Sequence, residues 1–252
     1  TSRHEPLASL GDSLALSRVS TSASGFAGGT FDVGSYKNET IGLIEVGAQG
    51  RRRRSEVFAS DHLGDAVARL YERYAELLPD GPERVRAAAT ARSVATLLVG
   101  PVDLDRYGAA LAPAVEFVDR RPLGLPSSRG AEQLVHRFRT LLEVSDDIVI
   151  RTDEVLALRS DALLVRRTNF GTARVGGGAY ERHFFVLWMF GADGLVTRGE
   201  MLDADRDTDA LARFDELTAG PPPARFANAS ARLTDRFARC WRERDWDGMV
   251  AT

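Results

Sequence analysis

Two charged residues two positions apart, Arg198 and Glu200, are the first candidates for chemistry in this sequence. The segment around them is rich in strand-forming residues, and side chains two apart on a strand share one face of the sheet. There an arginine and a glutamate can form an ion pair in a pocket or hold a water molecule. The same pair recurs as Arg54 and Glu56. The simpler interpretation is a salt bridge that fixes the sheet.

Other candidates for a catalytic or metal site are weaker. His136 lies on the polar side of a predicted helix, which is typical of a surface histidine, and His183 lies on a predicted strand. No His-x-x-x-His pattern and no cluster of carboxylates has the spacing of metal ligands. The glycine-rich residues 25–34 are not followed by Gly-Lys-Ser/Thr, so they are not a phosphate-binding loop. The sequence therefore predicts neither a metal ion nor a cofactor.

Composition limits the possible partners. The chain has 252 residues with 33 basic and 36 acidic side chains, a net charge of -3, and thus no general basicity to hold a polyanion. Four consecutive arginines at 51–54 lie on a predicted strand, where they alternate between its faces without interleaved aromatic residues. A solvated hairpin arm is the better interpretation of this run. We therefore expect no nucleic-acid partner.

The sequence also indicates a compartment. Cys240 is the only cysteine, which excludes an intramolecular disulfide and favours a reducing cytoplasm. The longest uninterrupted apolar run, 184–190, is far shorter than the roughly 20 residues of a transmembrane helix, and no signal peptide opens the chain. Lys37 is the only lysine, an arginine bias typical of a GC-rich bacterial genome. We expect a cytoplasmic bacterial protein with no membrane partner.

An internal repeat organises the chain. Residues 36–75 align without a gap with residues 180–219, 144 positions later, and fourteen of the forty pairs are identical. Upstream of residue 25 the offset becomes 148, which pairs Arg18 with Arg166, and a shorter echo relates residues 229–232 to 89–92. A period of this length is a domain-sized unit. The sequence predicts the C-terminal part of a first copy at 1–79, a complete domain at 83–219, and the N-terminal helix of a third, truncated copy at 224–252.

The complete copy has a readable order of elements. Helical spacing of apolar residues alternates with β-branched and aromatic stretches, and proline or glycine clusters stand at the breaks. The order is two helices, a strand, a helix, an antiparallel meander and a short closing helix, which predicts an α+β fold with the helices on one face of a sheet. The predicted helices are 83–98, 104–111, 130–142 and 207–217, and the predicted strands are 115–119, 148–152, 154–158, 162–168, 182–190 and 195–202.

These residues resemble the nuclear transport factor 2-like superfamily, in particular its SnoaL-like polyketide cyclase and ketosteroid isomerase relatives. The resemblance is carried by residues 105–113, by 115–119, by the helix start at Arg129-Gly130 and by the 191–194 hairpin running into Arg198-Gly199-Glu200. It covers the complete copy and, through the repeat, most of the flanking segments, as in tandem domains of large proteins of high-GC bacteria. It implies a cone-shaped domain in which a curved antiparallel sheet and its helices enclose a pocket.

The resemblance also suggests a catalytic candidate. Asp119 falls where ketosteroid isomerases have their general base, and an apolar cavity can raise the pKa of such a carboxylate enough to shuttle a proton. However, the two oxyanion donors of the isomerases correspond to Ala95 and Val186, neither of which can donate a hydrogen bond. The alternative is a strand-end carboxylate paired with Arg120 or Arg121.

Strand 182–190 is apolar on both faces, so both must be covered. The position of Val186 indicates that its even-numbered face lines the pocket, while the other face, with His183, is expected to meet a second subunit or a neighbouring repeat. A core filled by side chains is the alternative to an open pocket. The predicted pocket residues are Tyr107, Phe117, Arg166, Phe184, Val186, Trp188 and Glu200.

Three functions follow from these patterns. The first is a small-molecule-binding or self-associating module, without strong catalysis, whose ligand is apolar or aromatic. The second is a cyclase, isomerase or dehydratase that uses Asp119. The third is a purely structural dimerisation scaffold. In addition, the C-terminal helix is expected to dock on the N-terminal half, within one chain or from a partner chain, through Phe226, Leu233, Phe237 and Trp241.

Overall fold

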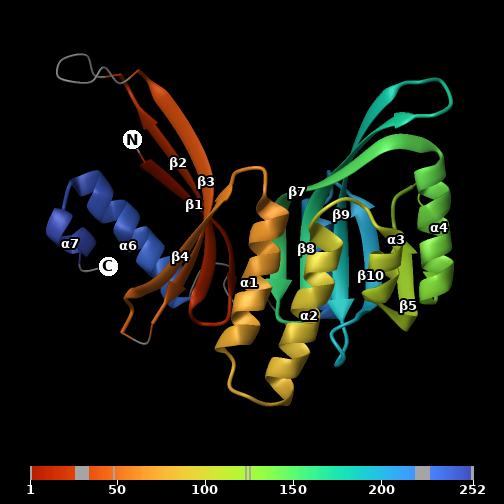
Figure 1. The fold of residues 1–252 in the computed structure, drawn as a ribbon, viewed down its shortest axis with the longest axis horizontal. Coiled ribbons are helices and arrows are strands. Elements are labelled where there is room, and N and C mark those ends of the chain that lie inside the picture. Colours follow the sequence, from red (N-terminus) through yellow and green to blue (C-terminus); the bar gives the residue numbers. More distant parts are fainter. Residues whose placement is uncertain are drawn as a thin grey trace. The chain divides into compact units, whose positions relative to one another are not determined.

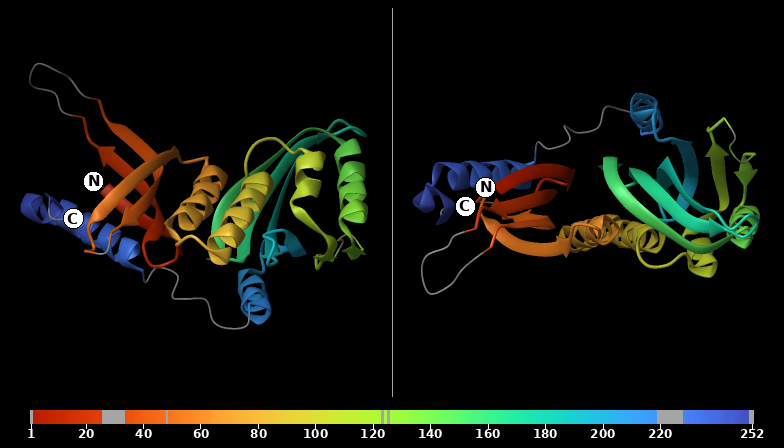
Figure 2. Two further views of the ribbon diagram at one scale, coloured as in Figure 1. Left: turned by 60° about the horizontal axis from the view of Figure 1, so that its bottom comes forward. Right: turned by 90° about the horizontal axis from the view of Figure 1, so that it is seen from above.

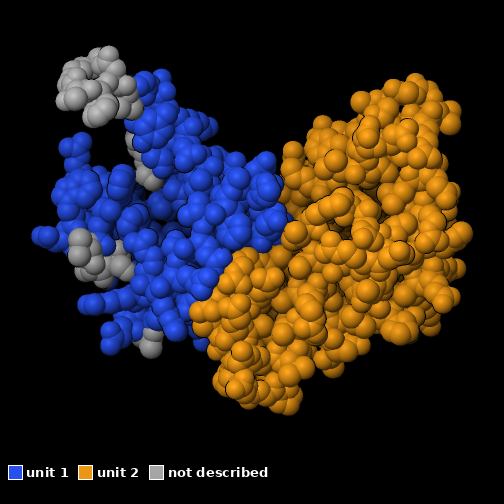
Figure 3. All heavy atoms as spheres, viewed as in Figure 1, with its two compact units in different colours: residues 1–66, 224–252 blue, residues 67–223 orange. Residues whose placement is uncertain are grey.

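The computed structural model describes residues 2–25, 34–47, 49–122, 124, 126–218 and 228–250. These residues form two units, described separately below: a first unit of residues 1–66 and 224–252, and a second unit of residues 67–223 (Figure 3). The division falls inside α1 (Leu63–Leu77). The proline and glycine residues at 79–82 would place the boundary between the domains later in the chain. The domain limits 1–79, 83–219 and 224–252 stay a prediction.

The first unit is built on a four-stranded antiparallel sheet with the order β1-β2-β3-β4 (Figure 1). Its interior contains aliphatic side chains that are wholly buried, among them Leu14, Leu16 and Ile41. β4 carries the arginine run, and most of its residues are exposed. The strands are β1 (Ser2–Leu10), β2 (Leu14–Ala23), β3 (Tyr36–Val46) and β4 (Arg52–Ala59).

Helix α6 (Ala229–Glu243), from the other end of the chain, packs on this sheet against β1, β2 and β3. Asn228 caps it: the side-chain oxygen accepts the Ala231 N–H, and its amide donates to the carbonyl oxygens of Gly11 and Leu14 at 3.1 and 2.6 Å. The Ser230 hydroxyl donates to the Ile44 carbonyl at 2.7 Å. The predicted docking of the C-terminal helix on the N-terminal half is confirmed for these residues.

Not every side chain of that helix packs as predicted. Leu233 is buried, but Trp241 is 40% exposed. The Trp241 ring stacks on Phe237 and meets Trp246 of α7 (Trp246–Val250) edge-on. Phe226 lies outside the described residues. Cys240 of α6 is buried, and its Sγ lies 3.8 Å from an Asp245 carboxylate oxygen.

The second unit contains a six-stranded sheet with the order β6-β5-β10-β9-β8-β7, in which β5 and β10 are parallel and the other neighbours are antiparallel. Figure 2 shows its long strands bending along their length. The predicted α+β class is confirmed. The elements in chain order are α2 (Pro82–Leu98), α3 (Leu104–Ala109), β5 (Leu111–Asp119), β6 (Ser128–Arg129), α4 (Ala131–Glu143), β7 (Ser145–Arg159), β8 (Ala162–Ala173), β9 (Ala179–Phe190), β10 (Val196–Asp203) and α5 (Asp207–Leu217).

Two local features differ from the prediction. The predicted strands 148–152 and 154–158 are one strand, β7, whose pairing with β8 shifts register between Thr152 and Glu154 and at two other places. An extra residue in a strand bends it without ending it, so a break in alternation is mistaken for a turn. The short strand β6, which pairs with β5, was not predicted.

One face of this sheet is covered by α5, and we call it the α5 face. Phe185 and Leu187 of β9 are wholly buried there against Ala210 and Phe214 of α5. The prediction that the odd-numbered face of this strand meets a second subunit or a neighbouring repeat is therefore wrong for these residues. The closing helix folds back and covers the sheet within the same unit. We call the opposite face, toward α3 and α4, the cavity face.

Candidate functional site

A cavity of about 490 Å³ opens on the cavity face of the second unit. Tyr107 of α3, Phe117 of β5 and the β9 residues Phe184, Val186 and Trp188 line it, together with residues of α4 and β7. Five of the predicted pocket residues thus lie together. A volume of this size is typical of sites that enclose a small organic molecule.

Strand alternation explains the apolar wall. Side chains two apart on β9 point the same way, which brings Phe184, Val186 and Trp188 to the cavity and leaves Phe185 and Leu187 to α5. The cavity thus lies on the side of this strand to which the prediction assigned it. Next to it in the sheet, Gly199 makes room for an aromatic ring: a Cβ there would lie 2.8 Å from the Phe117 ring.

Aromatic packing connects this wall to the helices. The Phe138 ring of α4 meets Tyr107 and Phe117 edge-on, with ring centroids 5.3 and 5.7 Å apart. Burial raises the pKa of the Tyr107 hydroxyl, although Arg167 and a hydrogen bond from the Trp188 indole act in the opposite direction. The hydroxyl therefore stays protonated at neutral pH.

The cavity also contains a charge that the sequence did not single out. Arg167 of β8 is 6% exposed, and its guanidinium carbon lies 5.7 Å from the centroid of the Trp188 ring. Its Nε is buried without a hydrogen-bond partner. Burial lowers the pKa of Arg167 to about 10, although Tyr107 and Asp153 act to raise it, so the group is still charged at neutral pH. Alternation from Val165 would have placed Arg167, and not Arg166, in the cavity.

Arg166 lies on the α5 face. Its guanidinium pairs with Asp207 at 3.1 Å and Glu154 at 3.6 Å, and it lies 5.0 Å from the centroid of the Phe185 ring. Adjacent side chains of a strand point to opposite faces, so Arg166 and Arg167 cannot both line the cavity. The prediction chose the wrong arginine of the two.

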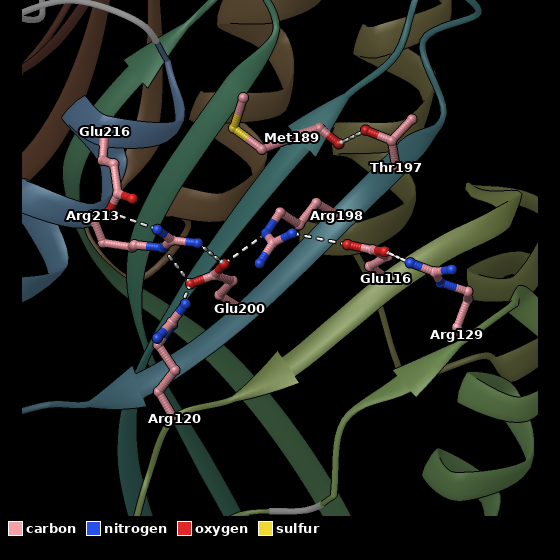
Figure 4. Close-up of polar contacts among 9 residues, drawn as sticks. All are labelled: Glu116, Arg120, Arg129, Met189, Thr197, Arg198, Glu200, Arg213 and Glu216. Atoms are coloured by element: carbon pink, nitrogen blue, oxygen red, sulfur yellow. Dashed lines mark hydrogen bonds and ion pairs between the residues drawn. The ribbon is translucent and has the colours of Figure 1, made fainter.

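Glu200 is the centre of an ion-pair network outside the cavity (Figure 4). Its carboxylate accepts hydrogen bonds from Arg120 and Arg198, both at 2.6 Å, and from Arg213 of α5 at 2.8 and 2.9 Å. Arg198 also reaches Glu116. Because Met201, the next residue, lines the cavity, Glu200 points to the α5 face. The predicted salt bridge with Arg198 is confirmed, and the prediction that Glu200 lines the pocket is wrong.

Electrostatics of this network indicate a structural role. The Glu200 side chain is wholly buried, and burial acts to raise the pKa of its carboxyl group. The hydrogen bonds from Arg213, Arg120 and Arg198 outweigh that effect and lower the pKa to about 2. The network therefore ties β10 to the end of β5 and to α5. Arg213 was missed as a member, yet it recurs in the repeat as Arg69 and could have been found that way.

Asp119 is engaged by the arginine two residues later. Nε and Nη2 of Arg121 donate to its two carboxylate oxygens at 2.8 and 2.7 Å, and the Arg121 N–H donates at 3.2 Å. The Asp119 side chain is wholly buried, whereas Arg121 lines the cavity. The hydrogen bond with Asp119 raises the pKa of Arg121, although burial opposes it. Asp119 thus takes the ion-pair alternative predicted for it, and its catalytic role stays a prediction.

The remaining polar candidates are peripheral. His136 is exposed, and His183 Nδ1 lies 2.8 Å from the Thr168 hydroxyl, outside the cavity. Within the described part of the chain, no group of three or more His, Cys, Asp or Glu side chains is placed to hold a metal ion. Nor does any helix of that part combine the length and apolar character needed to cross a bilayer.

Comparisons with known proteins concern the fold. No protein-family model and no curated protein sequence matches the chain. Among solved structures, it is similar to a nuclear transport factor 2-like protein from Burkholderia thailandensis, with 24% identity, 52% of this chain and 98% of that chain covered, and a TM-score of 0.38. It is also similar to a protein with a ketosteroid isomerase-like fold from Catenulispora acidiphila, in complex with trimethylamine, with 13% identity, coverage of 50% and 89%, and a TM-score of 0.37.

A phenazine biosynthesis-related protein from Pseudomonas aeruginosa is a third similar structure, with 17% identity, coverage of 56% and 92%, and a TM-score of 0.36. The chain resembles nuclear transport factor 2-like, ketosteroid isomerase-like and SnoaL-like proteins, as the sequence predicts. The likeness concerns architecture and does not extend to what these proteins bind.

Proposed function

We propose that the second unit is a small-molecule-binding module whose ligand occupies the 490 Å³ cavity. The observation that carries the proposal is the lining itself: aromatic side chains from α3, β5 and β9 surround an open space. A wall of this kind favours a ligand with an apolar or aromatic body, since burial of apolar surface supplies the driving force.

Strong catalysis has less support. An isomerase-type mechanism needs a free carboxylate to take up a proton, but both oxygens of Asp119 accept hydrogen bonds from Arg121. It also needs donors for the enolate oxygen, and the corresponding positions hold Ala95 and Val186. The cyclase or isomerase alternative would require Arg121 to release Asp119 when a substrate binds.

Self-association was inferred from an apolar outer face of strand 182–190. Because α5 covers that face, a dimer through this surface would have to displace the helix. A purely structural dimerisation scaffold would also leave the cavity unexplained. For these reasons the small-molecule module is the function that the geometry supports best.

Filling the cavity tests the proposal. Ile150 lines the cavity, whereas its neighbour Val149 is 58% exposed. Ile150→Trp should abolish the fluorescence increase of the neutral probe N-phenyl-1-naphthylamine, because the larger ring occupies the space of the ligand. Val149→Trp is the matched control and should bind the probe as the original protein does. A probe that fails to bind the original protein, or binds equally to both variants, would refute the cavity as its site.

A further inference from the structure

Arg167 is an unusual component of an apolar cavity. Its side chain is more than nine-tenths buried, and no ion pair with a carboxylate of the described residues involves it. Asp153 acts to raise the pKa of Arg167, but its oxygens are engaged by the Arg151 guanidinium at 2.6 Å and the Thr168 hydroxyl. A buried charge without a paired ion is costly to the fold, so such groups are normally compensated.

Other polar atoms beside Arg167 are also without partners. The hydroxyl of Thr152, which faces Arg167 across the β7–β8 ladder, and the side-chain oxygen of Asn169, two residues along β8, are both buried and make no hydrogen bond. A hydroxyl can turn its hydrogen toward an acceptor, and a carboxamide can present its NH₂ group. Arg167 and Asn169, which both line the cavity, can therefore donate to the same anion, and the Thr152 hydroxyl lies beside Arg167 in the sheet.

The other arginines of the cavity are placed differently. Arg121 is held in a bidentate pair with Asp119. Arg182 is an exposed residue whose guanidinium lies 4.8 Å from the centroid of the Tyr180 ring. Only Arg167 among these three is both buried and without a carboxylate. Its guanidinium carbon lies over the Trp188 ring, and the N–H groups of a guanidinium are suited to a carboxylate.

We propose that the ligand of this cavity is a monoanionic aromatic or alicyclic carboxylic acid, whose carboxylate pairs with Arg167 while its ring lies against Phe184 and Trp188. The inference rests on the proposed function and adds the charge of the ligand to it. A single carboxylate matches one guanidinium. A phosphate monoester, with close to two charges at neutral pH, would bury a second charge against an apolar wall.

The test is a pair of probes that differ in charge and little in shape. Isothermal titration calorimetry at neutral pH compares 2-naphthoate with 2-naphthamide. A charge-assisted hydrogen bond predicts roughly 10- to 100-fold tighter binding of the naphthoate. Arg167→Met keeps a long apolar side chain and should remove this preference while still binding the amide. Arg182→Gln, at the exposed arginine of the same cavity, is the control and should keep the preference.

Each outcome decides something. If both probes bind the original protein equally, the anionic ligand is refuted and the small-molecule module stands. If neither binds, both proposals fall. A preference for naphthoate that persists in Arg167→Met would mean that another group binds the carboxylate, and it would overturn the inference. Should Arg167→Met fail to fold by circular dichroism, Arg167→Lys supplies the comparison, because it keeps the charge without the bidentate geometry and should keep only part of the preference.

Discussion

In each unit a helix packs on a β-sheet, but the space beside the sheet is lined differently. At the 144-residue offset of the repeat, Thr40, Gly42 and Ile44 of β3 correspond to Phe184, Val186 and Trp188 of β9. One cavity between α6 and the sheet of the first unit has a volume of about 220 Å³, and its lining includes those three residues together with Leu233 and Phe237. The aromatic wall of the second unit is therefore not a requirement of the sheet, which supports its assignment to a ligand.

Some charged residues are shared by the two units, and others are found in one unit alone. The pair Arg54–Glu56 of the first unit, with Nε and Oε1 2.7 Å apart, repeats the pair Arg198–Glu200 of the second at 2.6 Å. By contrast, Arg167 corresponds at the 148-residue offset to Val19, which lines the smaller cavity. The ion pair recurs because both sheets use it, whereas the cavity arginine belongs to one unit alone. The Arg–Glu pair is therefore interpreted as structural, whereas Arg167 is interpreted as a residue of the ligand cavity.

Removing the central carboxylate of each network should give the largest contrast between the units. In Glu200→Gln three arginines lose their shared buried partner, which is expected to cost about 3–5 kcal/mol of unfolding free energy. Glu56→Gln should cost about 1 kcal/mol or less, because Arg54 is 48% exposed and its ion pair is screened by water. Urea unfolding measures both losses. Equal losses would contradict the view that the network of the second unit is the stronger one.

Acid should act through the same carboxylate. The pKa of Glu200 is about 2 in the folded protein, against an ordinary value of 4.5. A lowered pKa stabilises the fold above the ordinary value, and this contribution, roughly 3 kcal/mol at most, is lost as the pH falls from 4.5 toward 2. The difference in urea unfolding between the original protein and Glu200→Gln should therefore shrink over that range. A difference that stays constant down to pH 2 would contradict the assigned pKa.

β9 and its neighbours show which features of the fold can be predicted from the sequence. Although the position of Val186 in the resemblance selected the cavity face, alternation along residues 184–190 grouped the side chains of each face, since a period of two is a local property of a strand. It did not reveal the cover of the opposite face, because α5 reaches Phe185 only through the turn after β10. The long strand β7 was split in two because its bulges interrupt the alternation. Local patterns survive in the fold, whereas long-range packing has to be observed.

The site residues show the same limit. Phe117, Tyr107 and Trp188 were predicted from a resemblance that fixes whole elements, and elements were placed correctly. Arg166 and Glu200 were placed on the wrong face, an error of one residue in the phase of a strand. Arg167 was missed because its neighbour Arg166 was the arginine assigned to the pocket. A check of which arginine shares a face with Val165 would have found it.

The cap of α6 tests the construction of the first unit. Asn228→Ala removes the N-cap and the two hydrogen bonds to the Gly11 and Leu14 carbonyls, and should cost about 1–2 kcal/mol. Hydrogen exchange should then become faster in α6 and at the β1–β2 turn, while β7 to β10 stay protected. Asn38→Ala, at an exposed position of β3, is the control and should change neither. Unchanged protection of α6 in Asn228→Ala would show that the cap does not hold the helix to this sheet.

Exchanging the residues that differ between the cavities gives the smallest effect on stability and the sharpest test of the comparison. Arg167→Met removes a buried charge without a paired carboxylate, so it should leave the unfolding free energy equal to or about 1 kcal/mol above that of the original protein. Val19→Arg should lower it by about 1 kcal/mol, because it introduces such a charge beside the smaller cavity.

The sign of the pH dependence distinguishes this explanation from ordinary packing. Because the pKa of Arg167 is lowered to about 10 from 12.5, the folded protein bears the cost of the charge at neutral pH and is relieved of it as the pH rises through 10. The stability advantage of Arg167→Met should therefore decrease above pH 10, as measured by urea unfolding of the two proteins side by side. A loss of stability in Arg167→Met at every pH would mean that Arg167 holds the frame, as Glu200 does, and would remove the distinction between the two units.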